Sequence, residues 1–277
     1  MLRLTLFLVI ITLASCTSTN QNNNEADKFP GSARWIGDAA EQATSDSLMY
    51  LDDPAPLFRK KFNTGKKIKS AKLFISAAGY YRATINGKRI GDHFLDPAWT
   101  NFSKRIYYSE YDISTDITEG ENCIGVTLGN GFYNPLPMKM WGGRNIREEL
   151  PVGRPVFIAN LVVEYENGTT EEIASDQSWK YEYGPLLRNS VYLGEVYDAR
   201  REVKGWNNPG HDDEAWKNAL EKDGPGGKLE KIFFPPIQIT EKINPIEIYE
   251  QEGGLFVVDM GVVVGHCHSY DRPPNTV

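Results

Sequence analysis

Hydrophobic and polar residues alternate along much of this chain in short segments, and beyond the N-terminus no long segment has helical periodicity. The segments are rich in β-branched and aromatic residues, which is typical of strands. Strands are predicted at residues 57–62, 71–77, 105–113, 123–128, 155–165, 171–174 and 179–183. Because Gly, Pro, Asn and Asp separate these runs, the pattern favours a sandwich or jelly roll over alternating βαβ units. The predicted fold class is therefore all-β.

Two Asn-Gly pairs mark tight turns between strand-like runs. Asn86-Gly87 follows RATI at residues 82–85, and Asn167-Gly168 follows VVEYE at residues 162–166. Asn and Gly tolerate the positive φ that a type I′ turn requires, so this pair between two such runs is a strong hairpin signal. We predict a β-hairpin at each pair.

The first residues have the pattern of a secretory signal. Arg3 precedes an apolar run over residues 4–13 that is too short to cross a bilayer as a helix. The run ends at Leu13-Ala14-Ser15-Cys16, which is similar to the lipobox of bacterial lipoproteins, where the Cys thiol takes a diacylglycerol. We therefore predict a signal peptide at residues 1–15, a lipid anchor on Cys16 and a place in the bacterial cell envelope, periplasmic or cell-surface. A cleaved signal followed by a chance Cys is the alternative.

Composition shifts along the chain indicate its domains. Residues 16–28 are polar and Asn-rich, and are expected to form a flexible tether. The main domain is expected at residues 29–222, followed by a Gly/Pro linker, DGPGG, at residues 223–227. Strand-like runs at residues 232–239 and 255–260 would begin a second β domain at residues 228–261. That start is too short to close a sandwich.

Charge argues against one class of partner, and the cysteine content argues against a disulfide-stabilised fold. The 277 residues include 37 Asp plus Glu against 30 Lys plus Arg, a net charge of -7, so the basic surface of a nucleic-acid binder is missing. With Cys16 acylated, Cys123 and Cys267 remain and form no even-numbered or Cys-x-x-Cys framework. Disulfides are therefore not expected to hold the fold. Cys123 lies in a strand-like run and is expected to be a small buried hydrophobe.

A series of motifs resembles the N-terminal domain of bacterial α-L-rhamnosidases. The motifs are AKLFISAAGYYRATINGKRIGD (71–92), LDPAWTNFSKRIYY (95–108), GNGFY (129–133), SDQSWK (175–180), GEVYDAR (194–200) and FVVDMG (256–261). Single pieces are common, but the series in this order is specific, and the resemblance covers residues 33–261. It implies a jelly-roll (galactose-binding-like) β-sandwich, followed by the incomplete start of a second β domain. It also implies rhamnose-containing glycans as partners.

The resemblance implies an activity for full-length family members, which remove terminal α-L-rhamnose with inversion. Inversion requires one carboxylic acid and one carboxylate. In the family both belong to a helical barrel beyond the β domains, and too few residues follow Gly261 for such a domain. The tail at residues 262–277 also departs from the family, which continues with Gln-Asn and a Gly-Trp strand. We therefore expect a fragment that recognises carbohydrate and is inactive alone.

Two other functions stay open at this point. One is a surface-anchored lipoprotein that uses the sandwich for protein adhesion, because a fold does not by itself determine a function. The other is a complete small glycosidase, which requires a carboxylate pair about 6 to 10 Å apart in a cleft. No sequence feature indicates such a pair.

A sugar site needs an aromatic face and a few polar groups, usually on loops at one end of a sandwich. Two loops have this composition. The first supplies Asp92, Asp96, Trp99 and Asn101, and the second supplies Phe132, Tyr133, Asn134, Trp141 and Arg144. Trp141 is expected to be the exposed platform, whereas the alternative for Trp99 and Tyr133 is packing in the core. The resemblance further suggests Ca²⁺, which some related rhamnose-binding domains use and which Asp and Asn oxygens would suit.

Two further segments have structural explanations. His266-Cys267-His268 are adjacent and lack distant partners, so they cannot enclose a tetrahedral ion, and we interpret them as part of an aberrant tail. In GHDDEAW, residues 210–216, an Asp before a short Ala-Trp turn is typical of an N-cap, whose carboxylate accepts backbone N–H groups.

Overall fold

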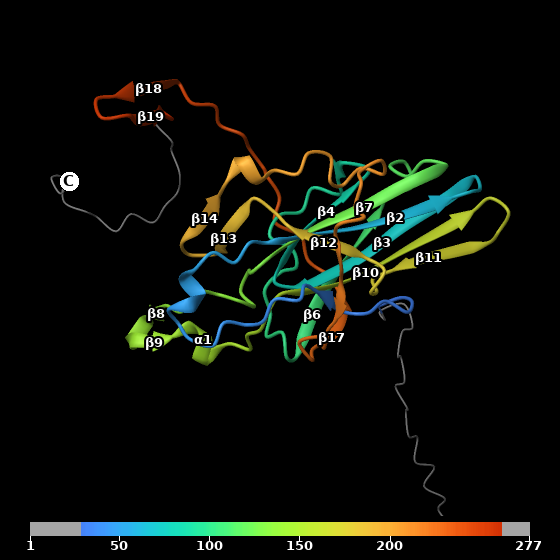
Figure 1. Ribbon diagram of the computed structural model, residues 1–277, viewed down its shortest axis with the longest axis horizontal. Coiled ribbons are helices and arrows are strands. Elements are labelled where there is room, and N and C mark those ends of the chain that lie inside the picture. The colour runs from blue at the N-terminus through green and yellow to red at the C-terminus, as the bar shows by residue number, and fades with distance from the viewer. Residues whose placement is uncertain (1–28, 262–277) are drawn as a thin grey trace, which may run out of the picture.

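The computed structural model describes residues 29–261, and its main body is a two-layer β-sandwich (Figure 1). One layer is a seven-stranded sheet in the order β16-β1-β10-β3-β6-β17, with β11 paired to β10. Its strands are β1 (Ile36–Gly37), β3 (Ile68–Ala78), β6 (Arg105–Asp112), β10 (Val156–Tyr165), β11 (Thr170–Ala174), β16 (Leu220–Glu221) and β17 (Lys228–Lys231). β17 runs parallel to β6, whereas β3 pairs antiparallel with both β10 and β6.

The second layer is a six-stranded sheet in the order β15-β12-β2-β7-β4-β5. Its strands are β2 (Pro56–Thr64), β4 (Tyr80–Ile85), β5 (Lys88–Arg89), β7 (Gly120–Gly129), β12 (Lys180–Tyr183) and β15 (Lys217–Asn218). Smaller pairs are β8 (Lys139–Met140) with β9 (Arg144–Asn145), β13 (Leu186–Ser190) with β14 (Gly194–Tyr197), and β18 (Glu247–Gln251) with β19 (Leu255–Asp259). The helical turns are short: η2 (Leu48–Tyr50), η3 (Trp141–Gly143), α1 (Ile146–Glu149) and η4 (Ala199–Arg201).

The core lies between the two sheets and consists of the side chains that alternation points inward. On β4, Tyr81, Ala83 and Ile85 are buried in this core, so the intervening Arg82 and Thr84 face the outer side of the sheet. Across the layers, the Phe58 and Phe157 rings meet edge to face with centroids 5.0 Å apart. The seven strands predicted for the sandwich correspond to β2, β3, β6, β7, β10, β11 and β12, and the all-β class is confirmed.

Both predicted hairpins form, with different turns. Asn86 and Gly87 have φ of 50° and 83° and close the two-residue turn between β4 and β5, as a type I′ turn requires. Between β10 and β11 only Gly168 has a positive φ, at 81°, and the Asn167 side chain instead accepts hydrogen bonds from Thr169. The second loop is therefore longer than a type I′ turn, although the pairing is as predicted.

The structure differs from the prediction after residue 227. Residues 232–239 form no named strand; only an isolated bridge joins Phe94 to Ile237. Pro235 and Pro236 explain this, because proline cannot donate to a strand ladder. In addition, β17 lies in the range assigned to the second domain, yet it adds an edge strand to the first sheet by pairing with β6. The sheet thus extends past residue 222.

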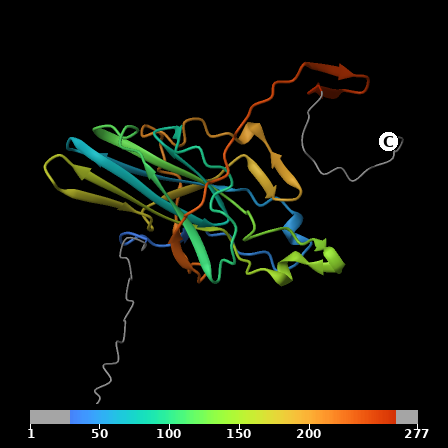
Figure 2. The same cartoon turned by 180° about the vertical axis from the view of Figure 1, so that it is seen from behind.

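After β17 the chain stays in contact with the sandwich as far as Gln238, which bonds to Asp92. Both views then show the β18–β19 hairpin standing apart from the sandwich (Figures 1 and 2). Among residues 29–261, no helix has the length and apolar character needed to cross a membrane. The predicted signal peptide, the Cys16 anchor, the tether and the tail with His266, Cys267 and His268 lie outside the described residues. Cys123 is fully buried, as expected.

Candidate functional site

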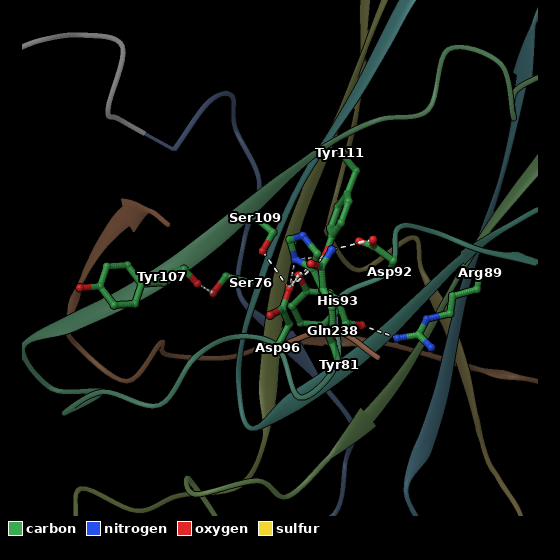
Figure 3. Close-up of polar contacts among 10 residues, drawn as sticks. All are labelled: Ser76, Tyr81, Arg89, Asp92, His93, Asp96, Tyr107, Ser109, Tyr111 and Gln238. Atoms are coloured by element: carbon green, nitrogen blue, oxygen red, sulfur yellow. Dashed lines mark hydrogen bonds and ion pairs between the residues drawn. The ribbon is translucent and has the colours of Figure 1, made fainter. Parts of the chain in front are cut away.

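The loop between β5 and β6 is fastened by a buried carboxylate, Asp96 (Figure 3). Its Oδ2 atom lies 2.8 Å from His93 Nδ1 and accepts hydrogen bonds from Tyr111 at 2.9 Å, Ser109 at 3.0 Å and Tyr81 at 3.2 Å. Asp96 was a sugar-binding candidate, and in the structure its Oδ2 atom is occupied by these groups of the protein itself. The cluster holds this loop against β4 and β6.

Burial also determines the chemistry of the two tyrosines in this cluster. It raises the pKa of Tyr81 and of Tyr111 well above the usual range, and the neighbouring Asp96 charge acts in the same direction. Both hydroxyls therefore stay protonated and remain donors at neutral pH. The cluster is a stable structural element under the conditions in which a sugar would bind.

Trp99 joins the two loops that the sequence selected. Its ring stacks on Phe132 with centroids 4.4 Å apart, and 52% of Trp99 is exposed. The alternative of a core role for Trp99 is therefore wrong, because the ring packs on another loop residue instead of entering the sandwich. Tyr133 does follow the packing alternative, since it is half-buried and lies edge-on to Phe102 at 5.2 Å.

The remaining candidates from the two loops do not converge. Asp92 is exposed and accepts a hydrogen bond from Gln238, while Asn101 accepts from the backbone and hydroxyl of Ser103. Asn134 is buried, and its amide bonds to Asn130 and Arg147. Arg144 is exposed, 3.6 Å from Glu149, and the Trp141 side chain lies outside the described part of the structure.

These placements do not fit a calcium site. The Oδ2 atom of Asp96 is occupied by hydroxyl and imidazole groups, and the Oδ1 atom of Asn101 accepts hydrogen bonds within its own turn. Among residues 29–261, no group of three or more His, Cys, Asp or Glu side chains is arranged to hold a metal ion. Ca²⁺ therefore has no ligand set built from the proposed residues.

A cleft of about 770 Å³ lies on the outer face of the six-stranded sheet. Its floor is formed by outward-facing residues of β4 and β7, and its walls by β13, β14 and the segment after η4. The lining combines aromatic rings with polar groups, among them Tyr80, Arg82, Thr84, Thr127, Asn189, Tyr197, Trp206 and Asn207. None of these residues was a sequence candidate. The cleft meets the Trp99 loop through Tyr80, whose ring lies edge-on to Phe132 at 6.5 Å.

The cleft contains both signs of charge. Arg82, Arg89 and Lys204 contribute cations, and Glu195 and Glu202 contribute carboxylates. The Tyr197 hydroxyl donates to Glu202 at 2.8 Å, and this bond raises the pKa of Tyr197. Both glutamates are exposed, whereas a general acid for glycoside cleavage needs burial to raise its pKa. The arrangement therefore suits binding better than hydrolysis.

The segment of residues 206–216 contributes Trp206 and Asn207 to the cleft lining, and a buried ion pair holds this segment to the sheet. Arg59 on β2 is fully buried and pairs with Asp213, which also lies 2.9 Å from Lys61. Asp212 accepts a hydrogen bond from the Glu214 N–H, in the manner of a capping residue. The acidic segment thus has the structural role expected of it, with the added function of supporting one side of the cleft.

Comparisons with known proteins agree with the motifs. The family model described as the α-L-rhamnosidase N-terminal domain matches residues 66–241. An α-L-rhamnosidase of Formosa agariphila is 35% identical over 252 residues, which cover 83% of this chain and 26% of that protein. One of Streptomyces avermitilis is 34% identical over 198 residues, covering 71% and 18% respectively. The chain thus spans about a quarter or less of the length of these relatives.

Solved structures give the same result. The α-L-rhamnosidase of Dictyoglumus thermophilum matches with a TM-score of 0.70 and 43% identity, covering 82% of this chain and 25% of that one. The Streptomyces avermitilis enzyme, solved with L-rhamnose, matches with a TM-score of 0.68 and 32% identity, covering 76% and 20%. From the motifs, the sandwich and these matches together, the chain belongs to the α-L-rhamnosidase family and corresponds to its N-terminal domain.

Proposed function

We propose that this domain is the carbohydrate-recognising part of an α-L-rhamnosidase, and that it binds rhamnose-containing glycans in the cleft without hydrolysing them by itself. The observation that carries the proposal is the cleft on the outer face of the six-stranded sheet, with its aromatic and polar lining. Concave sites of this size and composition are typical of small-molecule binding. The Streptomyces avermitilis relative, solved with L-rhamnose, supports rhamnose as the sugar.

The aromatic residues supply the stacking surface. Tyr197 on β14 is 53% exposed and lines the cleft opposite the sheet, and Trp206 and Tyr80 are half-buried in the same lining. An exposed ring exchanges water for the C–H face of a sugar, while nearby hydroxyl and amide groups bond to its hydroxyls. Because aromatic rings and polar groups line the same cleft, one sugar could stack on a ring and hydrogen-bond to neighbouring polar groups.

Calorimetric titration with a rhamnose-containing oligosaccharide tests the proposal. We expect a Kd of roughly millimolar to tens of micromolar, since a few stacking and hydrogen-bond contacts contribute only a few kcal/mol. Tyr197→Ala should weaken binding by about fivefold or more. Tyr192→Ala is the matched control, because Tyr192 lies on the same hairpin, is 41% exposed and is not part of the cleft lining.

The alternatives give different results in the same experiments. Protein adhesion through the sandwich would show attachment to a protein that free L-rhamnose does not compete, together with no sugar binding. Turnover of an aryl α-L-rhamnoside by the purified chain would contradict the claim that it only binds. Equal losses of sugar affinity in Tyr197→Ala and Tyr192→Ala would show that the sugar binds outside the cleft.

We further propose that the domain is anchored to the bacterial envelope through a lipid on Cys16. The support is the short apolar run that ends at Leu13-Ala14-Ser15-Cys16. Cys16→Ser should leave the protein unprocessed or release it from membranes. Equal partition of the variant and the wild type into the membrane fraction would refute the anchor.

A further inference from the structure

The three Asn-Gly pairs of the chain, at Asn86, Asn130 and Asn167, have different surroundings in the fold. An Asn before Gly is prone to lose its side-chain ammonia, because glycine has no side chain to shield its backbone nitrogen. Asn86 and Asn130 are half-buried, whereas Asn167 is exposed in the turn between β10 and β11. The three pairs therefore form an internal comparison, in which the dipeptide is constant and the surroundings vary.

In two of the pairs, the protein holds the amide nitrogen that would have to leave. Asn86 Nδ2 donates to the Asp116 carbonyl at 3.1 Å and to Asn122 Oδ1 at 2.8 Å. Asn130 Nδ2 donates to the Asn189 carbonyl at 3.1 Å. Release of ammonia from either side chain would break these hydrogen bonds, so we expect both side chains to react slowly.

The Asn167 side chain is held through its oxygen instead. Its Oδ1 atom accepts hydrogen bonds from the Thr169 backbone N–H at 3.0 Å and from the Thr169 hydroxyl at 2.7 Å. That hydroxyl in turn accepts a hydrogen bond from the Lys66 ammonium at 3.1 Å. Within residues 29–261, Asn167 Nδ2 bonds to no protein group. Two donors thus converge on the amide oxygen, one of them polarised by a cation, while the amide nitrogen is free to leave.

This arrangement assists the reaction that converts the amide to a cyclic imide. A solvent base takes the proton of the Gly168 backbone nitrogen in competition with its hydrogen bond to the Tyr165 carbonyl, and the nitrogen attacks Asn167 Cγ. Negative charge then develops on Oδ1, where the two Thr169 donors stabilise it as an oxyanion hole does. The bond from Cγ to Nδ2 breaks, Nδ2 takes a proton from water, and ammonia leaves. Water opens the imide at either carbonyl, which gives aspartate or isoaspartate.

We propose that Asn167 is a modification site of this protein, at which the folded chain deamidates spontaneously with the help of the Thr169 hydroxyl. Water is the co-reactant, and the reaction is independent of sugar binding in the cleft. Either product adds a negative charge near Lys66, and isoaspartate also lengthens the backbone between β10 and β11. The modification therefore changes both charge and geometry at this hairpin of the seven-stranded sheet.

Peptide mapping by mass spectrometry tests the proposal on the folded chain kept in mildly alkaline buffer. Deamidation adds about 1 Da to the peptide that contains Asn167, and a methyltransferase specific for isoaspartate identifies that product. We expect Asn167 to react roughly tenfold faster than Asn86 or Asn130. In urea, where the contacts of all three side chains are lost, the rates should become similar. Comparable rates at the three sites in the folded chain would overturn the inference.

Thr169→Val tests the hydroxyl, because valine keeps the shape and the backbone N–H of threonine and removes the side-chain donor. In the folded chain it should slow deamidation of Asn167 about fivefold, the effect of one hydrogen bond on a barrier, and in urea it should change nothing. Thr170→Val is the matched control, since Thr170 is exposed on β11 and does not bond to Asn167. Both variants should melt at the wild-type temperature. Equal deamidation rates in the two variants would overturn the role of the hydroxyl.

Discussion

Asp96→Asn tests the cluster that fastens the β5–β6 loop. The substitution keeps the size of the side chain and removes its charge. In the wild type, His93 and Tyr111 approach Oδ2 at 2.8 and 2.9 Å, and Ser109 and Tyr81 follow at 3.0 and 3.2 Å. An ionised carboxylate only accepts, so each of these groups acts as its donor. In the variant, one amide oxygen has to serve the same donors without a charge.

The expected loss of stability is estimated from the two shortest contacts of Asp96 Oδ2, those with His93 and Tyr111. A hydrogen bond to a charged group contributes about 1 kcal/mol more than one to a neutral group, and an oxygen has roughly two lone-pair directions to offer. The variant should therefore lose about 2 kcal/mol of the free energy of unfolding. For a domain of this size, that corresponds to a fall in Tm of about 4 to 8 °C.

Thermal and urea unfolding, followed by circular dichroism and tryptophan fluorescence, measure this loss. Asp92→Asn is the matched control: Asp92 lies four positions earlier, is exposed and has one hydrogen bond, from Gln238. It should change the free energy of unfolding by less than about 0.5 kcal/mol. Equal stability of Asp96→Asn and the wild type would refute the idea that the charge of Asp96 stabilises the loop.

Two pH-dependent effects should accompany this cluster and the ion pair under the cleft wall. Burial holds the pKa of Tyr81 far above the value of about 10 that it has when unfolded, so stability should fall as pH rises beyond about 10, and less steeply in Tyr81→Phe. For Asp213, burial raises the pKa, but Lys61 and Arg59 outweigh it and the net shift is downward, so its contribution is present above about pH 4 and is lost as pH falls further. Asp213→Asn should cost about 3 kcal/mol at neutral pH, because it leaves the buried Arg59 guanidinium without a counter-charge. It should also flatten the acid limb of the urea-unfolding profile, and an unchanged limb would contradict this.

Local patterns were sufficient to predict most of the sheets. In the strands of the sandwich, as on β4, apolar residues point into the core and polar residues point outward in alternation. Asn86 and Gly87 form the tight turn that their tolerance of positive φ allows. The local sequence pattern did not predict a strand whose position depends on pairing with a distant part of the chain. Residues 228–231 carry no strong strand signal, yet they pair with β6, which lies more than a hundred residues earlier in the chain. Pro235 and Pro236 lie within the strand predicted at residues 232–239 and account for its absence.

The site was harder to predict, because polar residues on loops have two uses that sequence alone does not separate. Asp96 and Asn134 looked like ligand groups, but each is buried and satisfies donors of the protein itself. For Trp99, packing in the core was the alternative to a sugar-binding role, but its ring stacks on Phe132 at the surface. Which of the two uses applies depends on contacts between segments, and a pattern within one segment does not contain them.

The residues that line the cleft could not be identified from the sequence either. Arg82 and Thr84 alternate with core residues on β4, so the sequence identifies them only as the outward face of a strand. They become the floor of a cleft because β14 and the segment after it return across that face. The return is secured by the Arg59–Asp213 pair and by Asn207, whose amide donates to Thr84 at 3.1 Å. Loss of the Arg59–Asp213 ion pair should therefore lower the affinity for glycan. We expect Asp213→Asn to weaken glycan binding at temperatures where the sandwich remains folded. Unchanged affinity in this variant would show that the wall holds its position without the pair.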